Sequence, residues 1–158
     1  MIDKRKMGKR SRAQGKAFEL RVRKDLEEKG WIVDRWNNQV SDFPDDNIKL
    51  PPELREDRKL IPAKAKFRGM GIPMMLSSGF PDFIAYKRVN KPEEMRVIKI
   101  KQTYEVIGVE CKMNGILDKQ EKEKCKWLLK NNIFSCIWIA SKTKVKNKVV
   151  IEYKEFKE

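Results

Sequence analysis

Apolar residues recur along the chain with the spacing of a helix in one segment and of strands in several others. From about residue 14 to residue 29 they return at every fourth position, at Phe18, Val22 and Leu26. This period predicts an amphipathic helix, and Gly30 is a typical helix stop. At about 100° per residue, Glu19 falls on the inward face beside these apolar residues. Glu19 is therefore either a half-exposed group at the edge of the apolar stripe or a functional carboxylate.

Short apolar runs with β-branched residues predict strands after that helix. They lie at Trp31–Trp36, Phe83–Tyr86, Arg96–Lys101, Tyr104–Lys112 and Val149–Tyr153. Ile133–Ala140 is almost wholly apolar, which is typical of a central strand covered on both faces. Asp118 predicts the start of a second helix that ends near Asn131, with Glu121 placed to complete a capping box.

The pattern breaks between about residues 37 and 77, where several residues interrupt it: Pro44, Pro51, Pro52, Pro62, Gly69, Gly71 and Pro73. This composition predicts an inserted loop, with a helical turn near Glu53–Leu60, rather than a second domain. Shorter turn-rich links are predicted at Lys87–Glu94 and Lys142–Lys148. The order of elements predicts an α/β fold with a central mixed sheet flanked by helices.

The composition fits one folded domain with a nucleic-acid partner. The chain has 158 residues, 40% of them apolar, enough for a single domain with a hydrophobic core over residues 14–158. Its formal charge of +14 and pI of about 9.7 imply a polyanionic partner. No segment reaches the roughly 18 consecutive apolar residues of a membrane span, and no apolar signal-peptide core follows the basic amino terminus. We therefore expect an intracellular, cytoplasmic protein that binds nucleic acid rather than membrane.

The amino-terminal segment is the most one-sided in charge. Residues 1–16 hold seven Lys or Arg and one acidic residue, Asp3. We predict that residues 1–13 form a flexible basic arm that is disordered until it meets phosphate. The candidates for DNA contact in and beside this arm are Lys9, Arg10, Arg12 and Lys16. A solvated terminus that only keeps the protein soluble is the alternative.

The chain contains no His and three cysteines, Cys111, Cys125 and Cys136. Their number is odd, and their spacing is not that of a zinc site or of a disulfide framework. They are interpreted as small core residues of a protein in a reducing compartment, rather than as metal ligands or disulfide partners.

Acidic residues beside two predicted strands carry the candidate chemistry. Side chains alternate along a strand, so Glu110 and Lys112 project on the same face at the end of one strand. Asp82 stands where the chain enters another strand and would bring a second carboxylate. Such a cluster suits phosphodiester hydrolysis, because carboxylates bind a hard cation that activates water and an ammonium neutralises charge developing on phosphorus.

The Glu-x-Lys spacing is weak evidence by itself in a Lys-rich chain. Acidic residues two positions before a Lys also occur at Glu27, Glu152 and Glu155, and a second Pro-Asp pair begins at Pro44. Only Glu110 ends an apolar strand, about thirty residues after a Pro-Asp that opens another strand, and just before a capped helix. This context distinguishes the Glu110 copy from the others.

Four motifs in order resemble the PD-(D/E)XK nuclease superfamily. They are the helix of Glu19, Gly79-Phe80-Pro81-Asp82-Phe83-Ile84, Val109-Glu110-Cys111-Lys112, and Gln120 in the next helix. The first helix, with Gly15 before Glu19 and Gly30-Trp31-Ile32-Val33 after it, is similar to archaeal Holliday-junction resolvases. The glycine before Pro-Asp and the helix of Gln120 are similar to the virus-type replication-repair nuclease domain. The matches span about residues 14–140 and imply a restriction-endonuclease-like core.

The resemblance also implies roles for individual residues. Mg²⁺ would be surrounded by Glu19, Asp82, Glu110 and the Cys111 carbonyl. Mn²⁺ would be able to take the place of Mg²⁺. Lys112 would be the catalytic lysine, and Gln120 would reach toward the phosphate unless it is an ordinary solvated glutamine. Ser77 and Ser78 resemble the serine ahead of the Asp in resolvases, which makes Ser78 a candidate DNA contact. The insertion over residues 37–77 departs from the compact resolvase pattern and leaves the substrate open.

The function implied by the resemblance is that of a Mg²⁺-dependent endodeoxyribonuclease. Structure-specific cleavage of branched DNA by a homodimer, as in a Holliday-junction resolvase, is the expectation. A general repair, processing or restriction-type nuclease is the nearest alternative, and a non-catalytic DNA-binding protein with a structural acidic cluster is the alternative outside enzymes. Trp36 and Trp138 are either core residues or part of a dimer interface.

Overall fold

The computed structural model describes residues 4–41, 58–63, 65–66, 75–76, 79–89, 103–146 and 148–157. Its helices are α1 (Lys4–Glu28) and α2 (Lys119–Lys130). Its strands are β1 (Ile32–Arg35), β2 (Asn38–Val40), β3 (Leu60–Pro62), β4 (Ala65–Lys66), β5 (Met75–Leu76), β6 (Phe83–Val89), β7 (Thr103–Cys111), β8 (Cys136–Val145) and β9 (Lys148–Glu155). Neither described helix has an apolar stretch long enough to cross a membrane.

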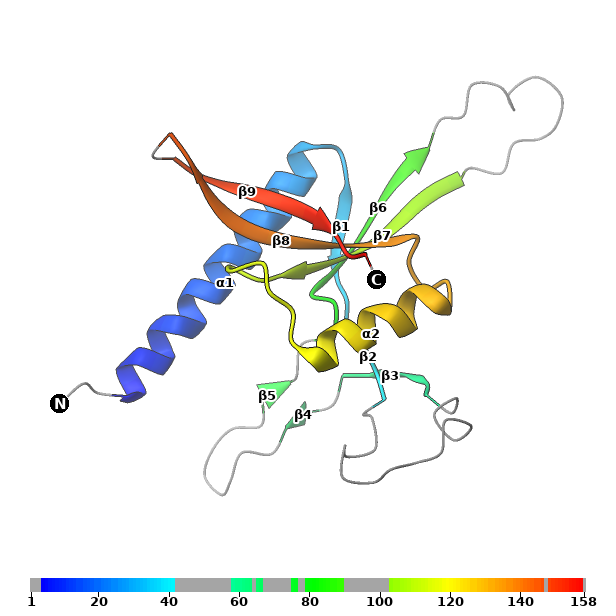
Figure 1. Ribbon diagram of the computed structural model, residues 1–158, viewed down its shortest axis with the longest axis horizontal. Helices are drawn as coiled ribbons and strands as arrows, with labels where there is room; N and C mark the ends of the chain where they lie inside the picture. The colour runs from blue at the N-terminus through cyan, green and yellow to red at the C-terminus, as the bar shows by residue number, and fades with distance from the viewer. Residues whose placement is uncertain are drawn as a thin grey trace, which may run out of the picture.

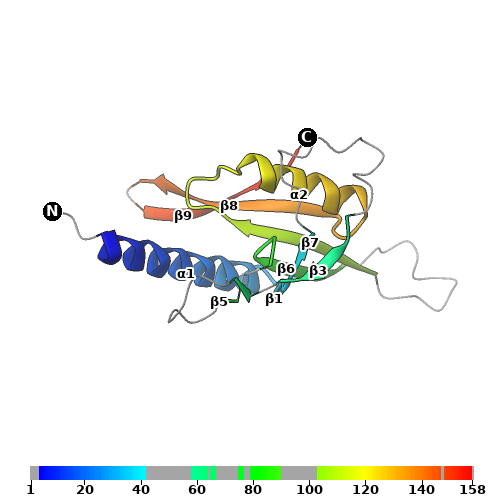
Figure 2. The same ribbon diagram turned by 90° about the horizontal axis from the view of Figure 1, so that it is seen from below.

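The central feature of the fold is a mixed sheet with strand order β1-β6-β7-β8-β9. β7 and β8 are parallel and are joined by α2, while the other neighbours are antiparallel. Helix α1 lies on one face of the sheet and α2 on the other (Figure 1 and Figure 2). The structure thereby confirms an α/β fold with a central mixed sheet flanked by helices.

Alternation along the strands divides the buried residues between the two faces of the sheet. The face under α1 holds Phe18, Val22, Leu26, Val33, Phe83, Ala85, Ile107, Val109 and Ala140. The face under α2 holds Val40, Phe80, Leu117, Cys125, Leu128, Phe134, Ile137 and Ile139. Val109 and Cys111 pack on the α1 face, so Glu110 between them points toward the α2 face.

Helix α1 begins at Lys4, so the prediction of a flexible arm over residues 1–13 is wrong for residues 4–13, and residues 1–3 lie outside the described residues. The prediction weighed the charge of the segment and not its helix propensity, although Lys, Arg, Met and Ala are good helix formers. Extending an existing helix adds hydrogen bonds without a new nucleation cost. The predicted stop is confirmed, because Gly30 adopts a φ of 83° and its N–H donates to the carbonyl of Glu27 at 2.9 Å.

The predicted irregular insertion contains paired strands in its described parts. β2 pairs with β3 and β4 pairs with β5, each antiparallel. Val40 of β2 is fully buried in the cluster under α2, and this apolar anchor favours a strand where prolines alone suggested a loop. Leu60 lies in β3, so the predicted helical turn over Glu53–Leu60 is wrong at its end, and residues 53–57 of that turn lie outside the described residues.

β6 is longer than the predicted strand over Phe83–Tyr86 and continues to Val89. The turn predicted over Lys87–Glu94 is therefore wrong in its first part, because β6 pairs with β7 as far as Val89 with Thr103. The strand predicted over Arg96–Lys101 lies outside the described residues.

β8 and β9 form a longer hairpin than the sequence predicted. β8 starts at Cys136 and continues to Val145, and β9 starts at Lys148. The turn predicted over Lys142–Lys148 is therefore wrong, except close to Lys146, which has a φ of 45°. Thr143 and Val145 alternate with lysines there, and β-branched residues favour an exposed strand despite the charge. The prediction of an edge strand at the end of the chain is confirmed by the place of β9 in the sheet.

Helix α2 begins as predicted, with Asp118 as its N-cap. The side chain of Asp118 accepts a hydrogen bond from the N–H of Glu121 at 2.8 Å, and that of Glu121 accepts one from the N–H of Asp118 at 2.9 Å. This reciprocal pair confirms the capping box.

Candidate functional site

Asp82 is positioned by a tight crossing of the chain just before β6. A Cβ built on Gly79 would stand 2.0 Å from the carbonyl oxygen of Trp36, so only glycine fits. Two backbone hydrogen bonds hold the crossing: the N–H of Phe80 donates to the carbonyl of Asn38 at 2.9 Å, and the N–H of Trp36 donates to that of Asp82 at 3.2 Å. The glycine of the Gly-Phe-Pro-Asp motif is therefore required by the close approach of two backbone segments.

The register of β6 against β7 brings Asp82 next to Glu110. Phe83 pairs with Val109, so Asp82 and Glu110 are the next residues along this pair of strands. The backbone N–H of Cys111 donates to Oδ2 of Asp82 at 2.9 Å and fixes this carboxylate at the end of β7. The structure thus brings together the two carboxylates that the sequence motifs predicted to be neighbours.

Glu110 is the most deeply buried charged side chain of the described residues, with 7% of its side chain exposed. Its Oε1 lies 3.3 Å from Nζ of Lys112. Its Oε2 is buried and has no hydrogen-bond partner within the part of the chain that the structure describes. An unpaired buried carboxylate oxygen is costly, and a bound cation is one partner that would satisfy it.

Lys112 stands between two carboxylates at the start of the connection to α2. In addition to Glu110, its Nζ pairs with Oε1 of Glu121. Burial by itself lowers the pKa of Lys112, but the hydrogen bonds and negative charges of Glu121 and Glu110 outweigh it and raise the pKa. The side chain therefore places a permanent positive charge beside the buried pair.

Burial raises the pKa values of both carboxyl groups of the pair. The pKa of Glu110 rises to about 8, first because of burial and second because of the negative charge of Asp82. The pKa of Asp82 rises to about 6, again mainly through burial, although the hydrogen bond from Cys111 opposes the rise. Each group resists ionisation beside the other unless further positive charge is supplied. The pair is therefore electrostatically suited to a cation.

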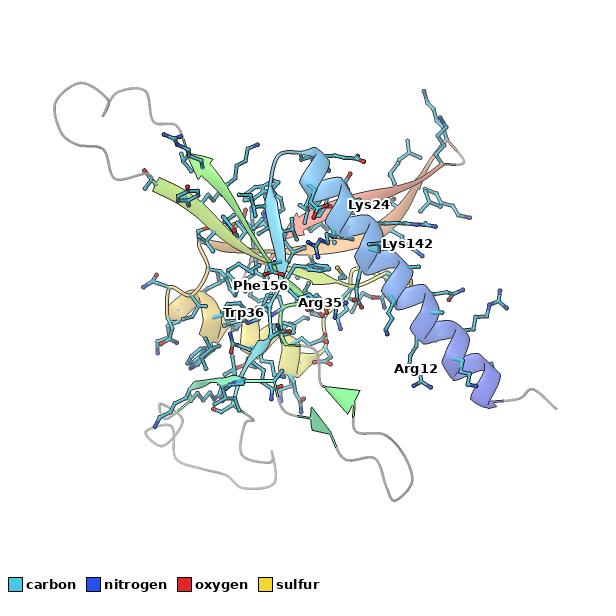
Figure 3. All side chains as sticks on the ribbon, turned by 180° about the vertical axis from the view of Figure 1, so that it is seen from behind. Arg12, Lys24, Arg35, Trp36, Lys142 and Phe156 are labelled. Atoms are coloured by element: carbon cyan, nitrogen blue, oxygen red, sulfur yellow. The ribbon has the colours of Figure 1, made fainter. Side chains whose placement is uncertain are left out.

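Glu19 pairs with Arg35 and acts on Asp82 through its charge. It belongs to α1, on the opposite face of the sheet from Glu110, and its Oε2 lies 3.2 Å from Nη2 of Arg35. The negative charge of Glu19 raises the pKa of Asp82 and the guanidinium of Arg35 lowers it, so both groups lie within electrostatic reach. Figure 3 shows Arg35 near the middle of the molecule, close to α1.

The carboxylates at the site can be compared with the ligands that Mg²⁺ usually takes. No group of three or more His, Cys, Asp or Glu side chains is arranged to hold a metal ion within the described ranges. Mg²⁺ usually takes one or two protein carboxylates and completes its shell with water and substrate phosphate. Asp82 and Glu110 fit this mode of binding, but not a preformed cage. The roles of Glu19 and of the Cys111 carbonyl as ligands stay predictions.

The other predicted site residues lie around the pair or outside the described residues. Gln120 is exposed in the first turn of α2, and its contact with phosphate stays a prediction. Ser78 lies outside the described residues. The basic candidates are exposed along the first half of α1: Lys9, Arg10, Arg12 and Lys16. Figure 3 shows Arg12 on the part of α1 that extends beyond the sheet, and Lys24 on the part that covers it.

The three cysteines are free and lie against the core, as the sequence predicted. Cys125 is buried, and Cys111 and Cys136 are partly buried. Burial raises the pKa of each thiol, to about 12 for Cys125. They are therefore neutral packing groups.

Sequence reasoning missed two residues that touch the predicted site residues, Arg35 and Glu121. Arg35 lies two positions after Val33 in β1 and so shares its face, toward α1, a signal that the strand period contains. Glu121 was identified only as a capping residue. Its second contact, with Lys112, depends on the path of the connection between β7 and α2, which periodicity does not predict.

Comparisons with known proteins identify no family for this chain. No protein-family model, no curated protein and no solved structure matches it. The resemblance to PD-(D/E)XK nucleases therefore rests on the sequence motifs and on the placement of Asp82, Glu110 and Lys112.

Proposed function

We propose that this chain is a Mg²⁺-dependent endodeoxyribonuclease in which Asp82 and Glu110 bind the cation. The observation that supports the proposal best is the buried Glu110 oxygen that has no partner among the described residues, beside a second carboxylate and the ammonium of Lys112. Burying two carboxylates together is unfavourable unless a ligand compensates for it. A divalent cation would compensate for the two negative charges and would also supply chemistry suited to phosphodiester hydrolysis.

Each residue of the pair and Lys112 would have a distinct task. Mg²⁺, when bound, supplies polarisation of the phosphate and a lower pKa of a bound water. Asp82 and Glu110 would hold the ion, with Asp82 oriented by the N–H of Cys111. Lys112 keeps 27% of its side chain exposed, so its ammonium can lie against a phosphate oxygen and stabilise the charge that develops when water attacks phosphorus.

Helix α1 offers a path for the DNA backbone toward this pair. Residues three and four positions apart share one side of a helix, so Arg12, Lys16 and Glu19 lie on the same side of α1. Glu19 contacts Arg35 beside the site, and the basic residues extend that side toward the amino-terminal end, where α1 runs past the sheet (Figure 1). Phosphates bound along this side would be led to Glu19 and Arg35, whose charges act on Asp82.

A cleavage panel tests the proposal. Four-way junction, flap, single-stranded and linear duplex DNA are incubated with the protein in Mg²⁺, in Mn²⁺ and in a chelator. We expect cleavage of at least one substrate with either metal and none with the chelator, and we expect Asp82→Ala and Glu110→Ala to abolish it. Normal cleavage by a folded Glu110→Ala protein would refute the site.

The basic residues of α1 should supply salt-dependent affinity. Changing Lys9, Arg10, Arg12 and Lys16 together to Gln should weaken binding to all DNA sequences and reduce the salt slope by roughly one unit per lost contact. The matched control changes four exposed lysines elsewhere, Lys126, Lys130, Lys154 and Lys157, and so removes the same net charge. Fluorescence anisotropy at several salt concentrations measures both. Equal slopes for the two variants would mean that α1 is not a DNA contact.

A non-catalytic DNA-binding protein is the second candidate. The observation that favours it is the pairing of Lys112 with both Glu110 and Glu121, an arrangement that also occurs in purely structural charge networks. Under this alternative the basic half of α1 would bind DNA and no substrate of the panel would be cut. The panel therefore separates the two candidates.

Preference for branched DNA and a homodimeric state are part of the proposal and are supported by the resemblance to resolvases. A dimer with two-fold symmetry can make matched cuts on opposing strands of a four-way junction. Trp36 packs edge-on against Phe134 with ring centroids 5.1 Å apart, and Trp138 packs against Trp31 at 5.4 Å, so both Trp side chains contribute to the core. Sedimentation of the protein with and without a four-way junction tests the oligomeric state.

A further inference from the structure

A line of contacts connects the site with the cap of α2. Glu121 is the N3 residue of this helix, and its two carboxylate oxygens have different partners. Oε2 accepts a hydrogen bond from the backbone N–H of Asp118 at 2.9 Å, and Oε1 pairs with Nζ of Lys112. Nζ of Lys112 in turn lies 3.3 Å from Oε1 of Glu110. The cap, the lysine and the buried carboxylate are therefore joined without a gap.

Capping alone does not require the contact with Lys112. In a capping box the N3 side chain only has to accept a hydrogen bond from the N-cap N–H, which one oxygen of Glu121 does. The other oxygen is directed to Lys112, and Glu121 keeps only 17% of its side chain exposed in this position. The second contact is thus additional to the needs of the helix.

Lys112 needs a second partner to be held in one orientation. A lysine has a long, flexible side chain and loses much rotamer entropy when it is fixed. The contact with Glu110, at 3.3 Å, is longer than the roughly 2.7–2.9 Å of a strong charge-assisted hydrogen bond. Glu121 supplies the additional contact from the first turn of α2.

We propose that Glu121 is a positioning residue that holds the ammonium of Lys112 beside Glu110 from the first turn of α2. The inference rests on the proposed nuclease function and deepens it, because the start of α2 then sets where positive charge meets the scissile phosphate. Glu121 acts through Lys112 and does not itself touch the substrate.

Two substitutions within the same capping box separate positioning from capping. Glu121→Gln keeps an oxygen for the N–H of Asp118 and removes the carboxylate opposite Lys112. Asp118→Ala removes the acceptor for the N–H of Glu121 and leaves the contact with Lys112. With full-length protein, Mg²⁺ and a DNA that the wild type cleaves, Glu121→Gln should lower kcat by roughly 10- to 100-fold and leave KM within about twofold. Asp118→Ala should lower Tm by about 2–4 °C and leave kcat unchanged.

A stability measurement tests the pair without relying on cleavage. Lys112→Met removes the ammonium, so Glu121→Gln should change the urea midpoint differently in the wild-type and Lys112→Met backgrounds. Equal changes in both backgrounds, or a kcat of Glu121→Gln equal to that of the wild type, would overturn the inference. Different changes combined with an inactive wild type would discard the nuclease function and the positioning role with it, and leave only a structural ion pair.

Discussion

Two clusters of charged side chains lie on opposite faces of the sheet, and they differ in the hydrogen-bond and ion-pair partners of their carboxylates. On the α1 side, Asp25 accepts a hydrogen bond from the Tyr153 hydroxyl at 2.6 Å and pairs with Lys29 at 2.6 Å. On the α2 side, Glu110 meets Lys112 through one oxygen, and its other oxygen has no partner within the described residues. Both clusters contain a carboxylate and a lysine, yet of the two only the second contains a buried acceptor atom without a partner among the described residues.

Exposure makes the two clusters chemically different. The side chain of Asp25 is 30% exposed, and that of Glu110 is 7% exposed. A solvated carboxylate with near partners is an ordinary structural contact worth little energy. A buried carboxylate beside a second one is unfavourable for folding and is typical of a site that binds a ligand. Burial and an unmet oxygen, rather than the presence of Glu and Lys, distinguish the candidate site.

The largest expected difference between the clusters is in cleavage. Glu110→Gln should lower the single-turnover cleavage rate at least about 100-fold, because loss of a mere outer-sphere partner of a metal already costs about 10- to 100-fold. DNA affinity should stay equal or rise, because a negative charge near phosphate is lost. Asp25→Asn is the matched control and should cleave like the wild type. An equal loss of cleavage in both variants would show that the Glu110 cluster is no more important for cleavage than the Asp25 cluster.

The next difference is the pH dependence of stability in the metal-free protein. The pKa of Glu110 is about 8 in the folded state, above its ordinary value of 4.5. The folded state therefore keeps a proton that the unfolded state loses, so this stabilisation is complete below about pH 4.5 and is lost as the pH rises through about 8. Asp82 adds a further loss between 3.8 and about 6.

Urea unfolding at about pH 5 and about pH 8 measures this effect. Between these pH values, the free energy of unfolding of the wild type should fall by on the order of 1 kcal/mol or more beyond any fall seen for Glu110→Gln. Asp25→Asn should keep the wild-type pH dependence. If the wild type and Glu110→Gln change in parallel, Glu110 is not a buried, protonated group in the free protein.

The smallest effect is expected in the Asp25 cluster. Tyr153→Phe removes the hydrogen bond from the hydroxyl to Asp25 and keeps the aromatic ring. The free energy of unfolding should fall by about 0.5–1.5 kcal/mol, the usual contribution of one hydrogen bond, with no change in cleavage. Denaturant unfolding and the cleavage assay measure the two properties. A clear loss of cleavage in a stable Tyr153→Phe protein would contradict the purely structural role assigned to the Asp25 cluster.

Much of the fold could be predicted from local pattern. The four-residue spacing of Phe18, Val22 and Leu26 predicted the buried side of α1, and Asp118 with Glu121 predicted the start of α2. The prediction failed in highly charged segments, where the helix or strand propensity of the residues was not considered. Residues 4–13 are basic but good helix formers, and the lysines of the β8–β9 hairpin alternate with β-branched residues.

The candidate site was only partly predictable, because some of its contacts follow from local sequence patterns and others form only when distant segments pack together. Strand alternation predicted that Glu110 and Lys112 share a pocket, and the Pro-Asp motif predicted Asp82 beside them. The pairing of Glu19 with Arg35 requires the packing of α1 against β1, and that of Lys112 with Glu121 requires the path of a connection. Periodicity indicates which face a side chain such as Arg35 occupies, but not which partner it meets in the folded chain.

Binding of a divalent cation tests the central claim most directly. Mn²⁺ is titrated into metal-free full-length protein in the presence of an uncleavable DNA analogue, and free Mn²⁺ is followed by electron paramagnetic resonance. The account predicts that the wild type and Asp25→Asn bind additional Mn²⁺ beyond that taken up by the DNA alone, and that Glu110→Gln does not. Equal uptake by the wild type and Glu110→Gln, or no uptake beyond that of the DNA, would contradict the claim that Asp82 and Glu110 form a cation site.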